Sequence, residues 1–201
     1  MRYVQNFRIS YAVLFFSARL CTGSTEASPT FSDLSAALDS VAWNYKATIG
    51  CEIADKGVNE KPITLNLRNL KISAALDRIT AQRPIYDWRL KDGIYYVYPR
   101  ARNGGRVSDI LVKNFSIHNA SIGDAIVAIS ELPEVAKWLK RHGTHFRELE
   151  VGSETHTQRV SLTLSSATVS HILDSLAKKL GQRRWTVVHY GGHGEYLAIY
   201  L

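Results

Sequence analysis

Histidine is the residue type that most suggests chemistry in this chain, because all seven histidines lie in its second half. His142 with His145, and His189 with His193, form two local pairs. Neutral imidazoles that a fold brings together can hold zinc or copper. Neither pair has a carboxylate or thiol fixed beside it, and loop histidines of a basic protein are commonly just solvated. We therefore predict no metal site and no cofactor.

Recognisable catalytic motifs are missing from the sequence. It has no Gly-x-Ser-x-Gly elbow, no phosphate-binding Gly-Lys-Ser/Thr loop, no His-Glu-x-x-His and no paired-cysteine zinc spacing. Serine, histidine and aspartate occur without a spacing that favours a triad. Cys51 has no neighbour that marks it as a nucleophile, so a buried apolar thiol is the better interpretation. The sequence favours a non-catalytic protein over a hydrolase without a known motif.

A unit of strand, helix and hairpin spans residues 61–99. Alternation of apolar and polar residues over 63–68 predicts a strand with one buried face. A helix with one apolar stripe follows, with Ser73 as its expected cap, and it ends before Pro84. Residues 86–98 are aromatic and β-branched around an Asp-Gly pair, which predicts a hairpin with a tight turn.

The same pattern recurs 97 residues later, from Val160 onward. One offset aligns the apolar residues of the strand and the helix. It also aligns two chemically distinctive residues, Asp174 with Asp77 and Trp185 with Trp88. Because a single offset holds through strand, helix and the following strand without a gap, we interpret the two segments as a duplication.

Each unit is expected to begin with further elements. The predicted elements are a helix over 31–45 with Ser32 or Asp33 as cap, a strand over 49–54, a strand over 110–117, a helix over 122–132 that residues 133–142 extend or restart, and a strand over 146–151. The sequence thus predicts an α+β protein of two tandem small domains, each a βαββαββ-like unit of two helices packed on short mixed sheets. We expect the domains over 31–99 and 110–201, with a linker over 100–109.

The first 27 residues have the features of an export signal. Arg2 and Arg8 precede an apolar run over 9–16, and small polar residues follow. That run is too short to span a bilayer as an ordinary helix, so we expect no stable membrane span after signal removal and a periplasmic or secreted protein. Two alternatives are a buried or frayed N-terminal segment of a cytoplasmic protein, and a lipoprotein attached through Cys21.

The chain carries a net charge of +7, which suits anionic neighbours but does not choose among them. Basic and aromatic side chains also gather in the predicted hairpins and at a helix end, where cross-strand packing and unsatisfied carbonyls offer structural explanations. The candidate residues for binding a partner or polymer are Arg89, Tyr95, Lys178, Lys179, Arg183, Arg184 and Tyr196.

The strand and helix pattern ITLNLRNLKISAALDRI, with its later echo, is similar to the short N-terminal domain shared by secretins and TonB-dependent receptors. In that family a strand of the ITLNL kind precedes a helix of the xxALDxIL kind and a hairpin. The matching positions are Ile63, Leu65, Leu67, Leu70, Ala75, Leu76 and Ile79, and in the echo Val160, Leu162, Leu164, Ala167, Ile172, Leu173 and Leu176. The resemblance implies a periplasmic module that recognises partner proteins.

Two functions of different classes follow. The first is a non-catalytic module that docks an envelope protein, from secretion or receptor machinery, through a sheet edge or hairpin face. The second is a binder of anionic polymer, either cell-wall glycan or nucleic acid, through the basic groups and stacking aromatics.

Overall fold

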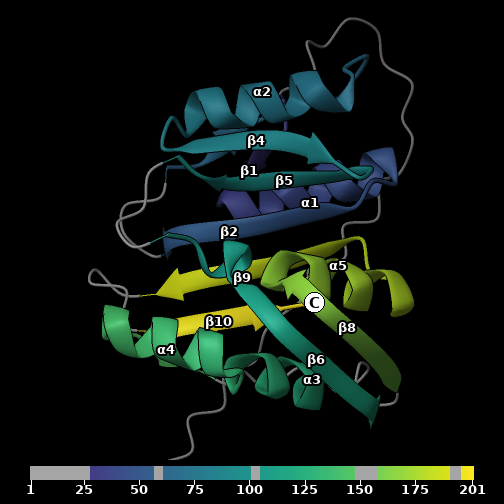
Figure 1. Ribbon diagram of the computed structural model, residues 1–201. Helices are drawn as coiled ribbons and strands as arrows, with labels where there is room; N and C mark the ends of the chain where they lie inside the picture. Colours follow the sequence, from purple (N-terminus) through teal and green to yellow (C-terminus); the bar gives the residue numbers. More distant parts are fainter. Residues whose placement is uncertain (1–27, 57–60, 101–104, 148–157, 191–195) are drawn as a thin grey trace, which may run out of the picture.

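A six-stranded mixed sheet runs through both halves of the chain (Figure 1). The computed structural model describes residues 28–56, 61–100, 105–147, 158–190 and 196–201, and among them it has five α-helices and ten β-strands. The predicted α+β class is confirmed. Across the sheet the strand order is β4 (Tyr86–Lys91), β5 (Ile94–Pro99), β2 (Ile49–Lys56), β9 (Arg184–Tyr190), β10 (Tyr196–Tyr200) and β7 (His145–Phe146).

Two further strand pairs and the helices surround this sheet. β1 (Thr30–Phe31) pairs antiparallel with β3 (Ile63–Thr64), and β6 (Leu111–Ala120) pairs antiparallel with β8 (Val160–Thr168). The helices are α1 (Leu34–Tyr45), α2 (Ile72–Gln82), α3 (Ile122–Ser130), α4 (Pro133–His142), α5 (Val169–Lys179) and the 3-10 helix η1 (Val107–Asp109).

The order of elements repeats along the chain. The first half runs strand, helix, strand, strand, helix, strand, strand, and the second half repeats this order from β6 onward with α4 added. The order of strands in the sheet repeats as well, since β4-β5-β2 is followed by β9-β10-β7. The 97-residue offset places β9 on β4 and α5 on α2. The sequence repeat is thus accompanied by a repeat of topology.

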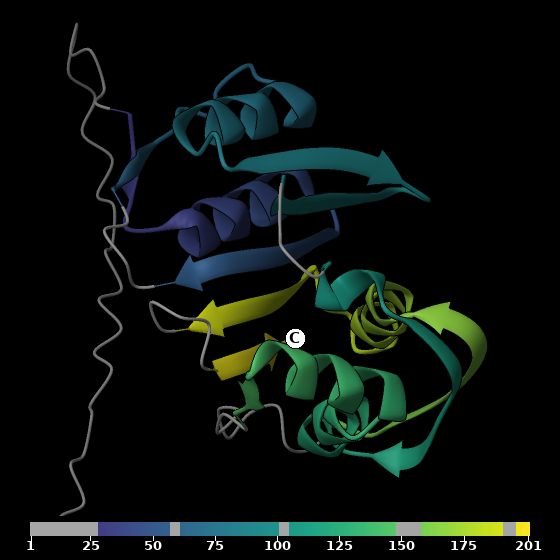
Figure 2. The ribbon, with the colours of Figure 1, turned by 60° about the vertical axis from the view of Figure 1, so that its left-hand side comes forward.

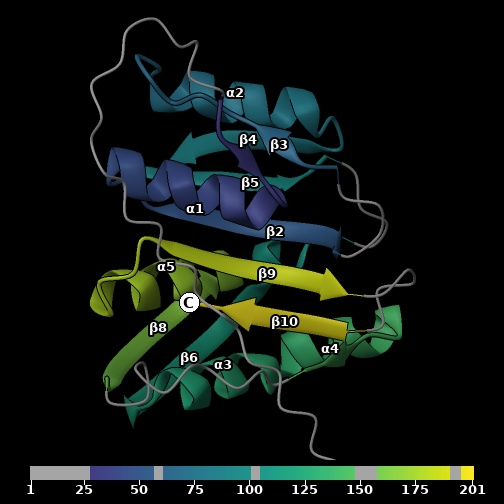
Figure 3. The same cartoon turned by 180° about the vertical axis from the view of Figure 1, so that it is seen from behind.

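The second half is turned over relative to the first. β4 runs antiparallel to β5, and β5 runs parallel to β2. β9 is the counterpart of β4, yet it runs parallel to β2. Reversing the strand direction while keeping the strand order exchanges the two faces of a sheet. The helices of the two halves consequently lie on opposite sides of the sheet (Figure 1, Figure 3).

Each half has a hydrophobic core on its own side of the sheet, and β9 contributes to both cores. Side chains alternate along a strand, so Trp185 and Val187 pack in the core of the second half whereas Val188 packs in the core of the first. Figure 2 shows β2 and β9 side by side at the centre of the molecule. The two halves are joined through a continuous sheet.

Several local sequence signals act as predicted. The Asp33 side chain caps α1 by accepting the backbone N–H of Ala36. Asp92 and Gly93 both have positive φ, which is the backbone of a two-residue hairpin turn. Pro133 occupies the first turn of α4, so residues 133–142 restart a helix and do not extend α3.

Two predictions in the first half are wrong in detail. Ser73 does not cap α2, because the helix begins at Ile72 after Lys71, whose side chain makes no capping bond. The strand predicted over 63–68 contains only Ile63 and Thr64, because its partner β1 is itself two residues long. In the second half, β7 begins at His145, and residues 148–151 of the strand predicted there lie outside the described residues.

Gly50 lies between two aromatic residues, one from each half, whose ring centroids are 6.2 Å apart. It pairs with Tyr96 on β5 and with Trp185 on β9. A Cβ added to Gly50 would lie 2.3 Å from Cζ2 of Trp185. We expect Gly50→Ala to lower the free energy of unfolding by about 1–3 kcal/mol, since the indole must shift within a packed core. Urea denaturation measures this loss.

Gly123→Ala is the matched control, because Gly123 lies in α3 where a new Cβ has space. The nearest atom to it would be Ser121 Oγ at 3.8 Å. This change should be neutral or should stabilise the protein by up to about 1 kcal/mol through helix propensity. Equal losses at the two glycines would contradict the close approach at Gly50.

Candidate functional site

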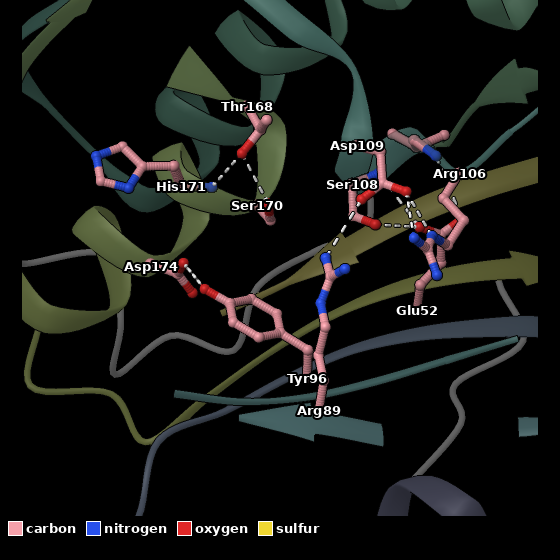
Figure 4. A network of polar contacts seen from close by, with 11 residues as sticks. Glu52, Arg89, Tyr96, Arg106, Ser108, Asp109, Thr168, Ser170, His171 and Asp174 are labelled. Atoms are coloured by element: carbon pink, nitrogen blue, oxygen red, sulfur yellow. Dashed lines mark hydrogen bonds and ion pairs between the residues drawn. The ribbon is translucent and has the colours of Figure 1, made fainter. Parts of the chain in front are cut away.

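The junction of β2 and β9 shows how this fold closes the edge of a strand. Trp185 of β9 lies against Gly50 of β2, and its Nε1–H donates to Asp174 Oδ1 at 2.6 Å. The hydroxyl of Tyr96, on β5, donates to the other carboxylate oxygen of Asp174 (Figure 4). Trp185 and Asp174 are both buried. The first half thus supplies a glycine and a tyrosine that cover an Asp–Trp pair of the second half.

Glu52 is a buried carboxylate at the same junction. Its Oε2 accepts from Ser108 Oγ at 2.6 Å and from the Ser108 N–H at 3.2 Å. Its Oε1 accepts the Val107 N–H at 3.3 Å and lies 3.1 Å from His189 Nε2. A buried charge persists only where donors surround it in this way. The Glu52 carboxylate therefore ties η1 and β9 to β2.

The prediction of solvated loop histidines is wrong for His189, which lies in β9 and has no exposed surface. Its expected neighbour His193 is outside the described residues. In the other pair His145 is exposed, whereas His142 stacks on Trp138 with ring centroids 4.0 Å apart and its Nδ1 lies 2.8 Å from the Trp138 carbonyl. Within the described residues no three His, Cys, Asp or Glu side chains form a group that could hold a metal.

Cys51 is fully buried in β2. Burial raises the pKa of its thiol to about 12. The prediction of a buried apolar thiol is confirmed, and this thiol is inert as a nucleophile at neutral pH because the thiolate is the reactive form.

The outer edge of the sheet carries a second Asp–Trp pair. Trp88 on β4 is the counterpart of Trp185, and its Nε1–H donates to Asp77 Oδ1 at 2.8 Å. Asp77 is exposed on α2, and Trp88 is only partly buried. Among the described strands β4 has one neighbour, β5. Among the described strands, the Asp–Trp pair of β9 thus has a neighbouring strand, β2, beside it (the closed junction), whereas the pair of β4 has none on its outer side (the open edge).

The free edge of β4 presents the backbone groups of Trp88 and Leu90. In a hairpin with a two-residue turn the flanking residues, here Lys91 and Ile94, form a hydrogen-bonded pair, so every second residue of β4 bonds to β5. The N–H of Trp88 points the other way and donates to Asp87 Oδ1 at 2.8 Å. The Leu90 side chain is 55% exposed. A strand edge of this kind is a template for pairing with another chain.

The seven binding residues predicted from sequence fall in three places. Arg89 and Tyr95 belong to the β4–β5 hairpin, where Arg89 forms a 3.7 Å ion pair with Asp109 and Tyr95 packs 6.0 Å from Trp88 between ring centroids. Tyr196 is 42% exposed at the start of β10. The hairpin lies at the β4 end of the sheet, and β10 lies near the other end.

The remaining four predicted residues lie at the connection from α5 to β9. Lys178 and Lys179 are exposed in the last turn of α5. Arg183 lies over the ring of Trp43 at 5.5 Å, and it borders a cavity of about 280 Å³. Arg184 and Thr186 also line this cavity, and the buried Thr186 hydroxyl has no hydrogen-bond partner among the described residues. The cavity has room for a small polar molecule.

Sequence patterns alone do not mark Glu52 as important, although a charged residue inside the apolar strand IGCEIA is a signal of a buried polar contact. The pairing of Asp77 with Trp88 and of Asp174 with Trp185 had a clearer signal, because one offset aligned both residues. What the offset does not give is the hydrogen bond within each pair.

A search of family models and of curated proteins found no match to this chain. In the described part of the chain no helix combines the length and the apolar character needed to cross a membrane.

Asp174 gives the junction a pH dependence. Burial raises the pKa of its carboxyl, while the hydrogen bonds from Tyr96 and Trp185 oppose this shift. A raised pKa means that the folded state binds the proton more tightly than the unfolded state, so stability falls as the pH rises from the ordinary aspartate pKa through the folded one. We expect wild-type protein to lose free energy of unfolding over that range relative to Asp174→Asn, as measured by urea denaturation at a series of pH values.

Tyr96→Phe provides the comparison. It removes one donor that stabilises the ionised carboxylate, so the decline with pH should become steeper. Identical pH profiles for the wild type and Asp174→Asn would contradict the role of Asp174.

Proposed function

We propose that this protein is a non-catalytic interaction module that docks a partner protein by strand addition along the free edge of β4. The supporting observation is the difference between two equivalent strands. β9 is paired with β2, whereas β4 keeps an open edge beside the same kind of Asp–Trp pair. An added strand would satisfy the outward backbone groups of Trp88 and Leu90.

Apolar surface beside the edge supports docking. The side chains of Ile85 and Leu90, near the start and end of β4, are 60% and 55% exposed. Fully burying side chains of this size contributes roughly 1.5–3 kcal/mol each. A docked strand would therefore gain apolar contacts in addition to backbone hydrogen bonds.

We further propose that the partner is a component of secretion or receptor machinery in the cell envelope. Residues 1–27 have the composition of an export signal, and they lie outside the described residues. The strand and helix pattern of each half resembles the short N-terminal domain of secretins and TonB-dependent receptors. Both observations favour a periplasmic or secreted protein that works by docking.

Binding of an anionic polymer is the competing function, and the arrangement of basic groups favours it less. The basic helix α4 and the C-terminal end of α5 lie at opposite sides of the second half (Figure 1, Figure 3). Arg89 and Arg184 are engaged in ion pairs with Asp109 and Asp39. Polymer binding asks for a coherent basic stripe of free cations.

Leu90→Pro tests strand addition, because proline removes the outward N–H at that position and leaves the β4–β5 hydrogen bonds in place. Immobilised wild-type protein is exposed to envelope extract at about 1 M salt, where the Debye length is about 3 Å. It should retain a protein partner identified by mass spectrometry. Leu90→Pro should weaken retention at least about tenfold, because an unpaired buried acceptor costs about 1–3 kcal/mol.

Leu90→Ala is the matched control, since it shortens the same side chain and keeps the N–H. Both variants lose the apolar contacts of Leu90, so the comparison between them isolates the N–H. Leu90→Pro should bind at least about fivefold more weakly than Leu90→Ala, and circular dichroism should show that both variants are folded. If Leu90→Pro is destabilised, slowed hydrogen exchange of the Trp88 and Leu90 amides of wild-type protein on addition of the partner provides the second measurement. Capture that Leu90→Pro does not reduce, or capture of polymer that disappears as salt rises, contradicts docking at β4.

A further inference from the structure

The charge of one residue distinguishes the open edge from the closed one. Asp87 on β4 occupies the position that Arg184 occupies on β9. Arg184 reaches to α1, where its Nε lies 2.6 Å from Asp39 Oδ1 and its Nη1 donates to Ser35 Oγ at 2.7 Å. The closed junction pairs a basic edge residue with an acidic neighbour. At the open edge the equivalent residue, Asp87, carries the opposite charge.

Asp87 also protects the open edge. Its Oδ1 accepts the N–H of Trp88 at 2.8 Å, and its Oδ2 lies 3.8 Å from Nε of Arg100. The N–H of Trp88 is one of the groups that an added strand would use. A strand gains this N–H only when the Asp87 carboxylate moves away from it. A cation on the added strand attracts the displaced carboxylate and stabilises the docked state, and an anion there destabilises the docked state.

Trp88 adds a steric requirement. In the closed junction a Cβ at Gly50 would approach the Trp185 indole to 2.3 Å, so any residue larger than glycine forces that ring to move. Trp88 makes the same kind of hydrogen bond as Trp185, from its Nε1–H to an aspartate on the helix that precedes its strand. A strand added to β4 in the manner of β2 therefore needs glycine opposite Trp88.

We infer that β4 binds a partner strand that runs parallel to it and carries glycine opposite Trp88 and a basic residue opposite Asp87. This inference deepens the proposed docking function and rests on it. β2 itself has the required glycine, Gly50, but it has the apolar Ile49 at the position where the basic residue is required. It is also already paired on both sides. β7, the counterpart of β2 in the second half, has only two residues in the described part of the chain. It is therefore a short strand to add to β4, and a second copy of this protein is a poorer occupant.

The test tethers candidate strands to the full chain. A tail copying residues 46–54, with serine at the position of Cys51, follows Leu201 through a Gly/Ser linker. A linker of about 20 residues has a root-mean-square length of about 25 Å. This spans the five strand spacings of about 4.8 Å each between β10 and a strand added on the outer side of β4. One tail has lysine at the position of Ile49, a second has glutamate there, and a third has lysine there with valine for Gly50.

Amide hydrogen exchange of Trp88 and Leu90, followed by NMR, reports pairing at β4. The lysine tail should slow exchange at least about tenfold, and the glutamate tail should protect at least about fivefold less, as expected for opposite against like charges across strands. The valine tail should give no protection because of the clash with Trp88. In Asp87→Lys the preference should reverse, with the glutamate tail protecting more than the lysine tail.

Equal protection by the lysine and glutamate tails, protection by the valine tail, or no protection by any tail would overturn the inference. Failure of the docking function is seen separately, as partner capture that Leu90→Pro does not reduce. Sedimentation of the protein without a tail tests the remaining occupant. Concentration-dependent self-association that Leu90→Pro abolishes would identify a second copy and would also overturn the inference.

Discussion

The pairing of β2 with β9 is the contact on which the rest of the structure depends. It joins two small sheets into one, and it places a carboxylate, Glu52, within hydrogen-bonding distance of groups in η1 and β9. Neither half could leave these groups unpaired without a large desolvation cost. Gly50 permits the contact because the indole of Trp185 takes the space that any side chain would fill. The backbone, the buried charge and the aromatic packing therefore require one another.

When two equivalent units form one sheet side by side, the edge strand of one unit becomes a central strand, and the equivalent strand of the other unit stays at the edge of the sheet. β9 and β4 have the same place in the repeat, but only β9 has a neighbour on both sides among the described strands. The way in which β2 pairs with β9 consequently indicates which kind of strand can pair with β4. The equivalent positions carry opposite charges, Arg184 on β9 and Asp87 on β4, while the backbone groups available for pairing are the same. An exposed edge with such a change discriminates among strands that hydrogen bonding alone would treat alike.

Part of this site was predictable from the residues. The aligned pairs of aspartate and tryptophan follow from the repeat, and the Asp92-Gly93 turn fixes which residues of β4 face outward. The predicted binding residues were only partly useful, because basic and aromatic side chains serve different local contacts. Arg184, for example, binds Asp39 in the other half, 145 positions earlier in the chain. Such a contact has no signature in local spacing.

The sequence by itself determined the α+β class, the internal repeat, the helix positions and the hairpin turn, because periodicity, caps and turn residues act over a few neighbouring positions. Only the tertiary structure decided that the two units share one sheet, that the second is turned over, and that His189 is buried against Glu52. These features depend on which strand edges meet, and pairing between distant strands is set by packing across the whole molecule. The same strand pattern can therefore end as a covered strand in one half and a free edge in the other.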